Sequence, residues 1–373
     1  MLTPENMGEV HEIWASLIQT VQDISYYHSW EWASGVAEFL YTDTRGIVYF
    51  VVWQGETPVA LFPLELKGHR FMGVAPCTDV SSLSHDHITF NDCLCSSGHD
   101  PVQLLQALVA ELETFTPSRW RLLGLHSILD GTPLRAAVAS INGFQTLCHT
   151  GPSSYYFDCT DTSIDALLPS RLRRNLRRRE RKAKKLGEIT FAYVDMRENS
   201  ASEEALDSFF QLECSGWKGR SGKNTAISLS SSLTGLYRNL ANATHNRYHC
   251  QINLMKIAGK PVAGQFCFLA DESIHLIKIG FDEAYKHCAP GSLLLLELLR
   301  KSILCKNTRR IHLVTAPSWA DRWHPKKLES RNVQIYNNSL PGSAQLLKAR
   351  MRQTISTLHS IVKTSRLLKR VVK

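Results

Sequence analysis

Three residues with small or restricted backbones, Pro290, Gly291 and Ser292, stand directly before the apolar run LLLLELL. Proline and glycine shape the chain where it enters a helix, and small side chains leave the first turn open. Free backbone N–H groups at such a turn can bind a phosphate. With Ala289 before them and Leu293 after them, these residues are a candidate anion site. Pro-Gly is also common before a helix where it only forms the boundary between a loop and the helix and binds no ligand, so that alternative stays open.

Two further stretches combine aromatic and charged side chains. GWKGRSGKNT (216–225) has a tryptophan, three cations and glycines, as a loop that grips a sugar phosphate would have. The alternative for this stretch is a helix end followed by a surface turn. WADRWHPKK (319–327) follows a predicted strand, where its polar side chains could overhang a cleft.

Other reactive residue types do not form a convincing site. His85 and His87 flank one residue, and together they would supply only two ligands, fewer than a metal site needs. His287 and Cys288 are sequence neighbours, which rarely brings the two side chains together productively. We therefore predict neither a metal nor a covalent nucleophile.

Length and composition indicate a two-domain protein of the cytoplasm. The chain has 373 residues, of which 43% are hydrophobic and 21% charged. Its first residues include acids where a signal peptide needs a basic start, and no apolar stretch approaches about 18 residues. The ten cysteines are scattered without a Cys-x-x-Cys pair, which fits a reducing compartment.

The formal charge of +9 is concentrated in two segments, and the rest of the chain is acidic overall. Residues 171–185 hold ten basic residues and one acid, and residues 344–373 hold eight basic residues and no acid. Leu168, Leu172 and Leu176 recur every four residues and predict a helix with one packed face. Its basic face could bind RNA, anionic lipid headgroups or an acidic neighbour, or the helix could simply be a solvated link between the domains. The absence of aromatic residues from the basic run disfavours single-stranded nucleic acid.

The order of predicted elements repeats in the two halves. From about residue 47 we expect a hairpin, a helix opened by Asp100-Pro101, a strand in RWRLLGLH, a helix and a last strand near SSYYFDC. From residue 248 we expect a three-strand meander, the helix after Pro-Gly-Ser, a strand in IHLVT and a last strand in NVQIYNN. This repetition predicts two copies of one α/β fold.

The chain also resembles the CelD/BcsL family of acetyltransferase-like proteins, relatives of the FemAB-type tandem-GNAT transferases. The resemblance rests on SWEW, TPVALFPLEL, RLRRNLRRRERKAKKLG, ECSGWKGRSGKNTAI, IGFDEAYKHCAPGSLLL and WADRWHPK in that order. It implies an α/β (α+β) fold of two tandem GNAT-like domains, with mixed, mostly antiparallel sheets flanked by helices. The boundaries that we predict are 1–160 for the first domain, 161–340 for the second, and 341–373 for a basic amphipathic C-terminal helix.

The activity implied by the resemblance is transfer of an acyl group from acetyl-CoA or another acyl-CoA to an amine. The acceptor would be an amino sugar or another amine of a polysaccharide or secondary-metabolite pathway. The expected catalytic residues are Asp282, which would accept the amine proton, Tyr285, which would protonate the thiolate, and Lys278, which would bind an anionic group or the acceptor. The expected cofactor-binding residues are 289–293.

The expected substrate-binding residues come from the two stretches with aromatic and charged side chains: Trp217, Lys218, Asp321, Arg322 and Trp323. One departure from the family pattern concerns the donor. A GNAT phosphate loop reads Arg/Gln-x-x-Gly-x-Gly/Ala, and this chain has HCAPGS at that place. Two alternatives remain. One is an aminoacyl-tRNA donor, as in FemAB-like proteins. The other is a non-catalytic accessory protein of an exopolysaccharide synthesis complex, held at an anionic membrane or beside a synthase by its basic segments.

Overall fold

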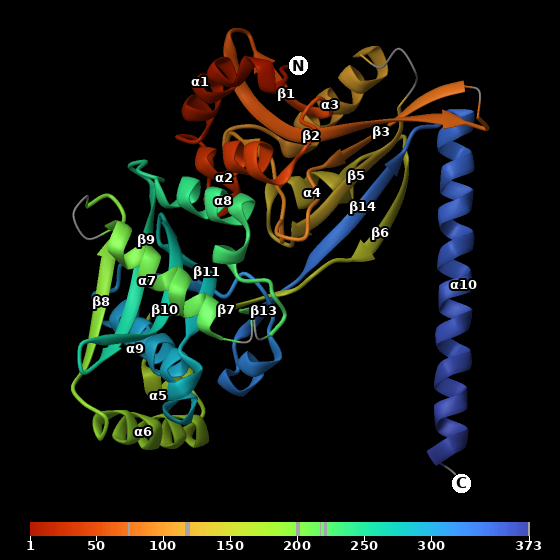
Figure 1. Ribbon diagram of the computed structural model, residues 1–373. Helices are drawn as coiled ribbons and strands as arrows, with labels where there is room; N and C mark the ends of the chain where they lie inside the picture. The colour runs from red at the N-terminus through yellow and green to blue at the C-terminus, as the bar shows by residue number, and fades with distance from the viewer. Residues whose placement is uncertain (74, 116–119, 199–201, 217, 220–221, 372–373) are drawn as a thin grey trace.

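The structure is a computed structural model, and it describes residues 1–73, 75–115, 120–198, 202–216, 218–219 and 222–371. Two seven-stranded sheets form the two halves of the molecule (Figure 1). Both are mostly antiparallel and are flanked by helices, which confirms the predicted fold class.

The first sheet has the strand order β1-β2-β3-β5-β14-β6, and β4 pairs with β2 beside this path. Its neighbouring strands are antiparallel except for β3 and β5. The first two strands form the hairpin that the sequence predicts. The strands are β1 (Ile47–Gln54), β2 (Thr57–Phe71), β3 (Ala75–Ser82), β4 (Leu94–Cys95), β5 (Trp120–Leu129), β6 (Gln145–Thr150) and β14 (Ser330–Tyr336).

The second sheet has the order β13-β7-β12-β11-β10-β9-β8. The predicted three-strand meander is confirmed as β9, β10 and β11, and the pair of β11 with β12 is parallel. The strands are β7 (Ser154–Asp158), β8 (Ile189–Asp195), β9 (Tyr248–Ile257), β10 (Lys260–Ala270), β11 (Ser273–Phe281), β12 (Arg310–His312) and β13 (Lys326–Leu328).

Helices cover both sheets (Figure 1). The first half has α1 (Met7–Leu17), α2 (Trp30–Gly35), α3 (Pro101–Phe115) and α4 (Pro133–Ser140), with short helical turns η1 (Pro4–Asn6), η2 (Tyr26–His28) and η3 (Val36–Leu40). The second half has α5 (Ile164–Leu167), α6 (Ser170–Lys184), α7 (Ser202–Ser215), α8 (Ser231–Ala241) and α9 (Pro290–Cys305), with the turns η4 (Ile227–Leu229), η5 (Glu283–Cys288) and η6 (Ser318–Trp323). The long helix α10 (Leu340–Val371) follows β14.

Two strands join the sheet of the other half. We expected the strand near SSYYFDC to end the first copy, but β7 pairs with β12 and β13 of the second sheet. We expected the strand in NVQIYNN to end the second copy, but β14 lies between β5 and β6 of the first sheet. Strand membership therefore does not follow the predicted boundaries of 1–160 and 161–340, which themselves stay a prediction.

The two halves pack through apolar side chains. One cluster of buried residues includes Trp14 and Trp32 of the first half together with Phe209 and Tyr237 of the second. The helices approach so closely that a Cβ on Gly235 would lie 2.6 Å from the ring of Phe39. Apolar burial of this kind is the main stabilising term in domain association.

The basic helix α6 and the C-terminal helix α10 contact the protein to different extents. Leu168, just before α6, and Leu172 and Leu176 on it are buried against the core of the second half, whereas α10 extends away from the body (Figure 1). None of the described helices combines the length and the apolar content that crossing a membrane requires.

The leucine stripe of α6 can be tested with two substitutions on one helix. Leu172→Asp should lower the free energy of unfolding by about 3 kcal/mol or more, because it places a charge among apolar neighbours. Arg178→Ala, on the exposed face, should change it by less than about 0.5 kcal/mol. Urea denaturation of both variants measures the difference, and equal midpoints would contradict the packed stripe.

Candidate functional site

The central feature of the site is the short parallel pairing of β11 with β12. Only Ser273–His275 of β11 pair with Arg310–His312 of β12, although β11 continues to Phe281. Beyond this pairing the two chain segments diverge. A groove of about 370 Å³ lies along the separated segments, between β11, the chain after β12 and the end of α7.

The groove has apolar walls and a free strand edge. Ile279 on β11 and Trp319 on η6 line it, and both side chains are exposed although they are large and hydrophobic. The carbonyl of Ile279 accepts a hydrogen bond from Lys218 Nζ at 3.4 Å, so this peptide edge faces the groove and not β10. An extended ligand with amide groups could hydrogen-bond to such an edge as a neighbouring strand would.

A buried carboxylate, Glu213 on α7, organises the end of the groove. One oxygen accepts from Lys218 Nζ at 2.9 Å, and the other accepts from the backbone N–H of Ile227 at 2.9 Å. The side chain is almost fully buried. Burial of a charge is tolerated when it is paired and hydrogen-bonded, as Glu213 is.

Lys278 lies on β11 beside this carboxylate and lines the groove. Burial lowers the pKa of Lys278 below its usual value, and the attraction to Glu213 only partly opposes that shift. Its Nζ lies 5.6 Å from the ring centre of Tyr237 on α8. The neutral amine form of Lys278 is therefore more accessible than that of an exposed lysine, which favours Lys278 as a proton acceptor.

The start of α9 adjoins the other end of the groove. Phe281 lines the groove, and a Cβ on Gly291 would lie 3.8 Å from its ring. Among the predicted anion-binding residues, the N–H groups of Ser292 and Leu293 already donate to the carbonyl of Ala289. Pro290 has no N–H, so Gly291 supplies the one N–H of this turn with no partner among the described residues.

Cations surround this turn. Arg322 donates to Ser292 Oγ at 3.3 Å, and Arg179 of α6 donates to the carbonyl of His287, three residues before the helix starts. We expected several backbone N–H groups to bind a phosphate here, and among the described residues only that of Gly291 is available. With two guanidinium groups nearby, this turn is still electropositive, and it adjoins the groove.

Two predicted catalytic residues lie at η5, outside the groove lining: Tyr285 is on this turn and Asp282 is its N-cap. Asp282 accepts from Lys260 Nζ and from the N–H of Ala284, both at 3.0 Å. Partial burial would raise the pKa of Asp282, but these hydrogen bonds lower it overall, which disfavours proton uptake. The ring of Tyr285 lies under the same Lys260, with Nζ 5.4 Å from the ring centre. Their catalytic roles stay predictions, and the geometry favours Lys278.

The predicted substrate-binding residues do not come together in one site. Asp321 accepts from Tyr155 Oη at 2.7 Å, and Lys218 lines the groove. Trp323 is completely buried, with its ring 6.2 Å from that of Phe157. This burial corrects the expectation that Trp323 overhangs the cleft, because its indole packs in the core. The prediction for Trp217 lies outside the described residues.

Sequence reasoning missed Glu213 and Trp319. Glu213 falls inside a helix whose pattern gives no sign that one acid is buried and paired with a lysine five positions later. Trp319 opens the WADRWHPKK stretch, and the aromatic residue that we chose there was the buried one. The sequence did indicate an aromatic residue at the groove in this stretch. It could not show which of the two tryptophans, Trp319 or Trp323, lines the groove and which is buried in the core.

The histidines at 85 and 87 lie in a turn, with their rings stacked and their centres 5.6 Å apart. Among the residues that the structure describes, no group of three His, Cys, Asp or Glu side chains is arranged to hold a metal ion.

The comparisons with known proteins agree with this geometry. Residues 170–323 match a family model described as "Acetyltransferase (GNAT) domain". The matched segment begins with α6 and ends with η6, and so contains the groove, Lys278 and the start of α9. No curated protein matches the chain.

Several solved structures share the fold of nearly the whole chain at low sequence identity. FemX has a TM-score of 0.55 and 11% identity, over 87% of this chain and 95% of its own. L-PGS from Bacillus licheniformis has a TM-score of 0.52 and 14% identity, over 90% and 95%. A C-terminal domain from Agrobacterium fabrum, described as that of a lysylphosphatidylglycerol synthetase, has a TM-score of 0.54 and 14% identity, over 94% and 97%.

Two glycines at the groove should respond differently to alanine. A Cβ on Gly280 would lie 2.7 Å from the backbone of Glu213, whereas Gly291 has room for one. Gly280→Ala should therefore lower the free energy of unfolding by about 1–3 kcal/mol, and Gly291→Ala should change it by less than about 1 kcal/mol. Thermal melts of both variants give the result, and a large loss for Gly291→Ala would show that the turn itself needs glycine.

Proposed function

We propose that this protein, which carries a GNAT-domain match over residues 170–323, is an N-acyltransferase that moves an acyl group from acyl-CoA to an amine. The observation that supports this most directly is the groove where β11 and β12 separate, with Lys278 in its wall and the start of α9 at its end. We place the extended arm of the donor along the free edge of β11 and its phosphates near Gly291, Arg322 and Arg179.

The reaction needs a neutral acceptor amine and a polarised carbonyl. Lys278 takes a proton from the acceptor ammonium, and the amine nitrogen then attacks the thioester carbon. A C–N bond forms and the C–S bond breaks, and the proton that the nitrogen loses as the amide forms goes to the departing sulfur, so that coenzyme A leaves as the thiol. We assign the stabilisation of the negative carbonyl oxygen to peptide N–H groups on the groove edge of β11. Positioning of the two substrates supplies much of the rate.

The acceptor that we propose is an amino sugar or another amine of a polysaccharide or secondary-metabolite pathway. This part of the proposal rests on the family resemblance and not on the groove. Lys218 and Trp319 line the groove and could contact such an acceptor through a cation and an aromatic face.

A second candidate donor is aminoacyl-tRNA. Helix α6 contacts the turn before α9 through Arg179, so its exposed cations continue from the phosphate end of the groove. A nucleic acid that reached the groove could lie along these cations, and its binding would weaken steeply with salt. The similar structures include FemX and a domain described as that of a lysylphosphatidylglycerol synthetase. The resemblance to FemAB-type proteins is the second reason to test this donor.

The role of Lys278 predicts opposite effects on activity and stability. Lys278→Met should lower kcat about 100-fold or more, because the general base is lost. The same variant should melt a few degrees higher at pH 7, since it removes a partly buried cation whose charged form is disfavoured by its surroundings. Lys348→Met, at an exposed position of α10 outside the groove lining, is the matched control and should change neither quantity.

The difference in stability between the wild-type protein and Lys278→Met should depend on pH, because the pKa of Lys278 is lowered in the folded chain. The unfolded chain binds a proton at Lys278 up to about pH 10.4, whereas the folded chain releases it at lower pH. The wild-type protein therefore gains stability between these two pKa values as pH rises, and the advantage of Lys278→Met should shrink toward pH 10. A variant that loses both activity and stability at pH 7 would contradict this role.

The donor can be identified with Gly291→Glu. The substitution puts a negative charge where phosphates should bind, so affinity for coenzyme A should fall at least about tenfold, while the melting temperature changes little because a side chain has room there. Isothermal titration calorimetry with coenzyme A and desulfo-CoA measures the affinity. A wild-type protein that binds tRNA in a salt-dependent way but not coenzyme A would favour the second donor, and one that binds neither would favour an accessory role.

A further inference from the structure

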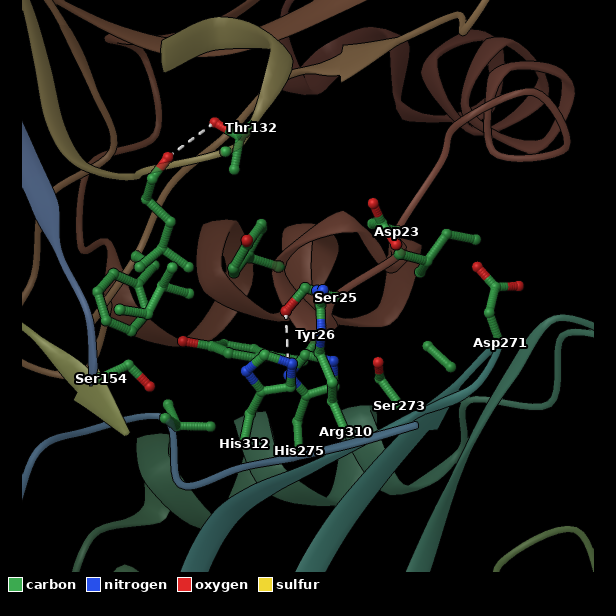
Figure 2. Close-up of a pocket in the computed structure, with 18 of the residues that line it drawn as sticks. Asp23, Ser25, Tyr26, Thr132, Ser154, Asp271, Ser273, His275, Arg310 and His312 are labelled. Carbon is green, nitrogen blue, oxygen red and sulfur yellow. Dashed lines mark hydrogen bonds between the residues drawn. The ribbon is translucent and has the colours of Figure 1, made fainter. Parts of the chain in front are cut away.

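A second cavity, of about 360 Å³, lies between the two halves of the molecule (Figure 2). The first half contributes the segment around η2 and the turn between β5 and α4. The second half contributes the beginning of β11 and β12. Its volume lies near the lower end of the range for small-molecule sites.

This cavity is separate from the groove. No residue lines both. His275 and His312, which are paired across β11 and β12, lie in its wall, and their rings stack with centres 4.7 Å apart and planes 9° apart. The groove begins one residue further along each chain segment, at Leu276 and Leu313.

His275 has an unused polar atom in this wall. The residue is 7% exposed, its Nδ1 lies 3.4 Å from Ser25 Oγ, and its Nε2 has no partner among the described residues. Burial, followed by the repulsion of His312 and His28, lowers the pKa of His275, and burial with the nearby Arg310 lowers the pKa of His312 to about 4. Both imidazoles are therefore neutral hydrogen-bonding groups at physiological pH.

Most of the charges around the cavity are already paired. Asp130 binds Arg135, Asp271 binds Arg247, and Glu272 binds Arg309.

Asp23 and Arg310 are the lining charges left without an ion pair among the described residues. They come from opposite walls, and Figure 2 shows the Arg310 side chain extending from β12 into the cavity toward the loop that carries Asp23. A guanidinium binds carboxylate or phosphate with two parallel hydrogen bonds, and a carboxylate binds a protonated amine.

We infer that this cavity binds a small zwitterion, whose carboxylate or phosphate lies at Arg310 and whose protonated amine lies at Asp23. The middle of the ligand contacts the imidazole of His275 and the hydroxyl of Ser25. Two sources have this chemistry: free α-amino acids, in which the charges are close, and phosphorylated amino sugars, in which they are far apart. The inference goes beyond the proposed function, because it concerns a site that shares no residue with the acyl groove.

The test is calorimetry on the full-length protein with L-serine and with glucosamine 6-phosphate. Ethanolamine and 3-hydroxypropanoate are the single-charge analogues of serine, and glucosamine and glucose 6-phosphate are those of the amino sugar. One zwitterion should bind at least tenfold more tightly than both of its analogues, and should raise the melting temperature because it joins the two halves. The zwitterion that binds identifies the source.

Three substitutions locate the ligand. Arg310→Gln and Asp23→Asn should each weaken binding of the zwitterion at least tenfold, whereas Arg309→Gln, on the neighbouring arginine already paired with Glu272, should weaken it less than twofold. Failure of both zwitterions to bind at millimolar concentration, equal binding of a single-charge analogue, or equal losses in all three variants would overturn the inference. Coenzyme A binding is measured separately, so failure of the groove proposal leaves this result interpretable.

Discussion

The short parallel pairing of β11 with β12 is the constraint on which both proposed sites depend. Three residues from each strand form the pairing, and a polar cavity lies at one end of it and an apolar groove at the other. A longer pairing would close the groove, because β12 would satisfy the peptide groups that now face it. The pairing also brings His275 and His312 together, so one set of backbone hydrogen bonds shapes both ligand environments.

The polar end of the groove depends in turn on one buried carboxylate. Glu213 joins the end of α7 to the start of η4 through Ile227 and to the loop through Lys218, and its backbone contacts β11 at Gly280. The same charge opposes the loss of the proton from Lys278. Burial and this attraction together set the pKa of Lys278, so the position of α7 controls the proposed chemistry as well as the packing.

The exchange of β7 and β14 couples the halves more tightly than a linker could. Each strand leaves its expected copy and hydrogen-bonds within the other sheet. Apolar contact of α2 and η3 with α8 adds to this, with Phe39 of η3 packed against Gly235. A cavity between the halves can then keep a defined shape, since neither half can move far without breaking strand pairs.

The sequence by itself determined those elements that depend on residues close together in the chain. The meander from residue 248, the start of α9 at Pro290 and the leucine stripe of α6 follow from periodicity and turn residues, which act between neighbours. Pairing between distant strands and the burial of single side chains were decided by the tertiary structure. Residues far away in the sequence determine the pairing of β14, the core position of Trp323, the ion pair of Asp282 with Lys260 and the place of Arg310 in the cavity wall. No local pattern encodes these contacts, because their energies arise only once the two halves have folded against each other.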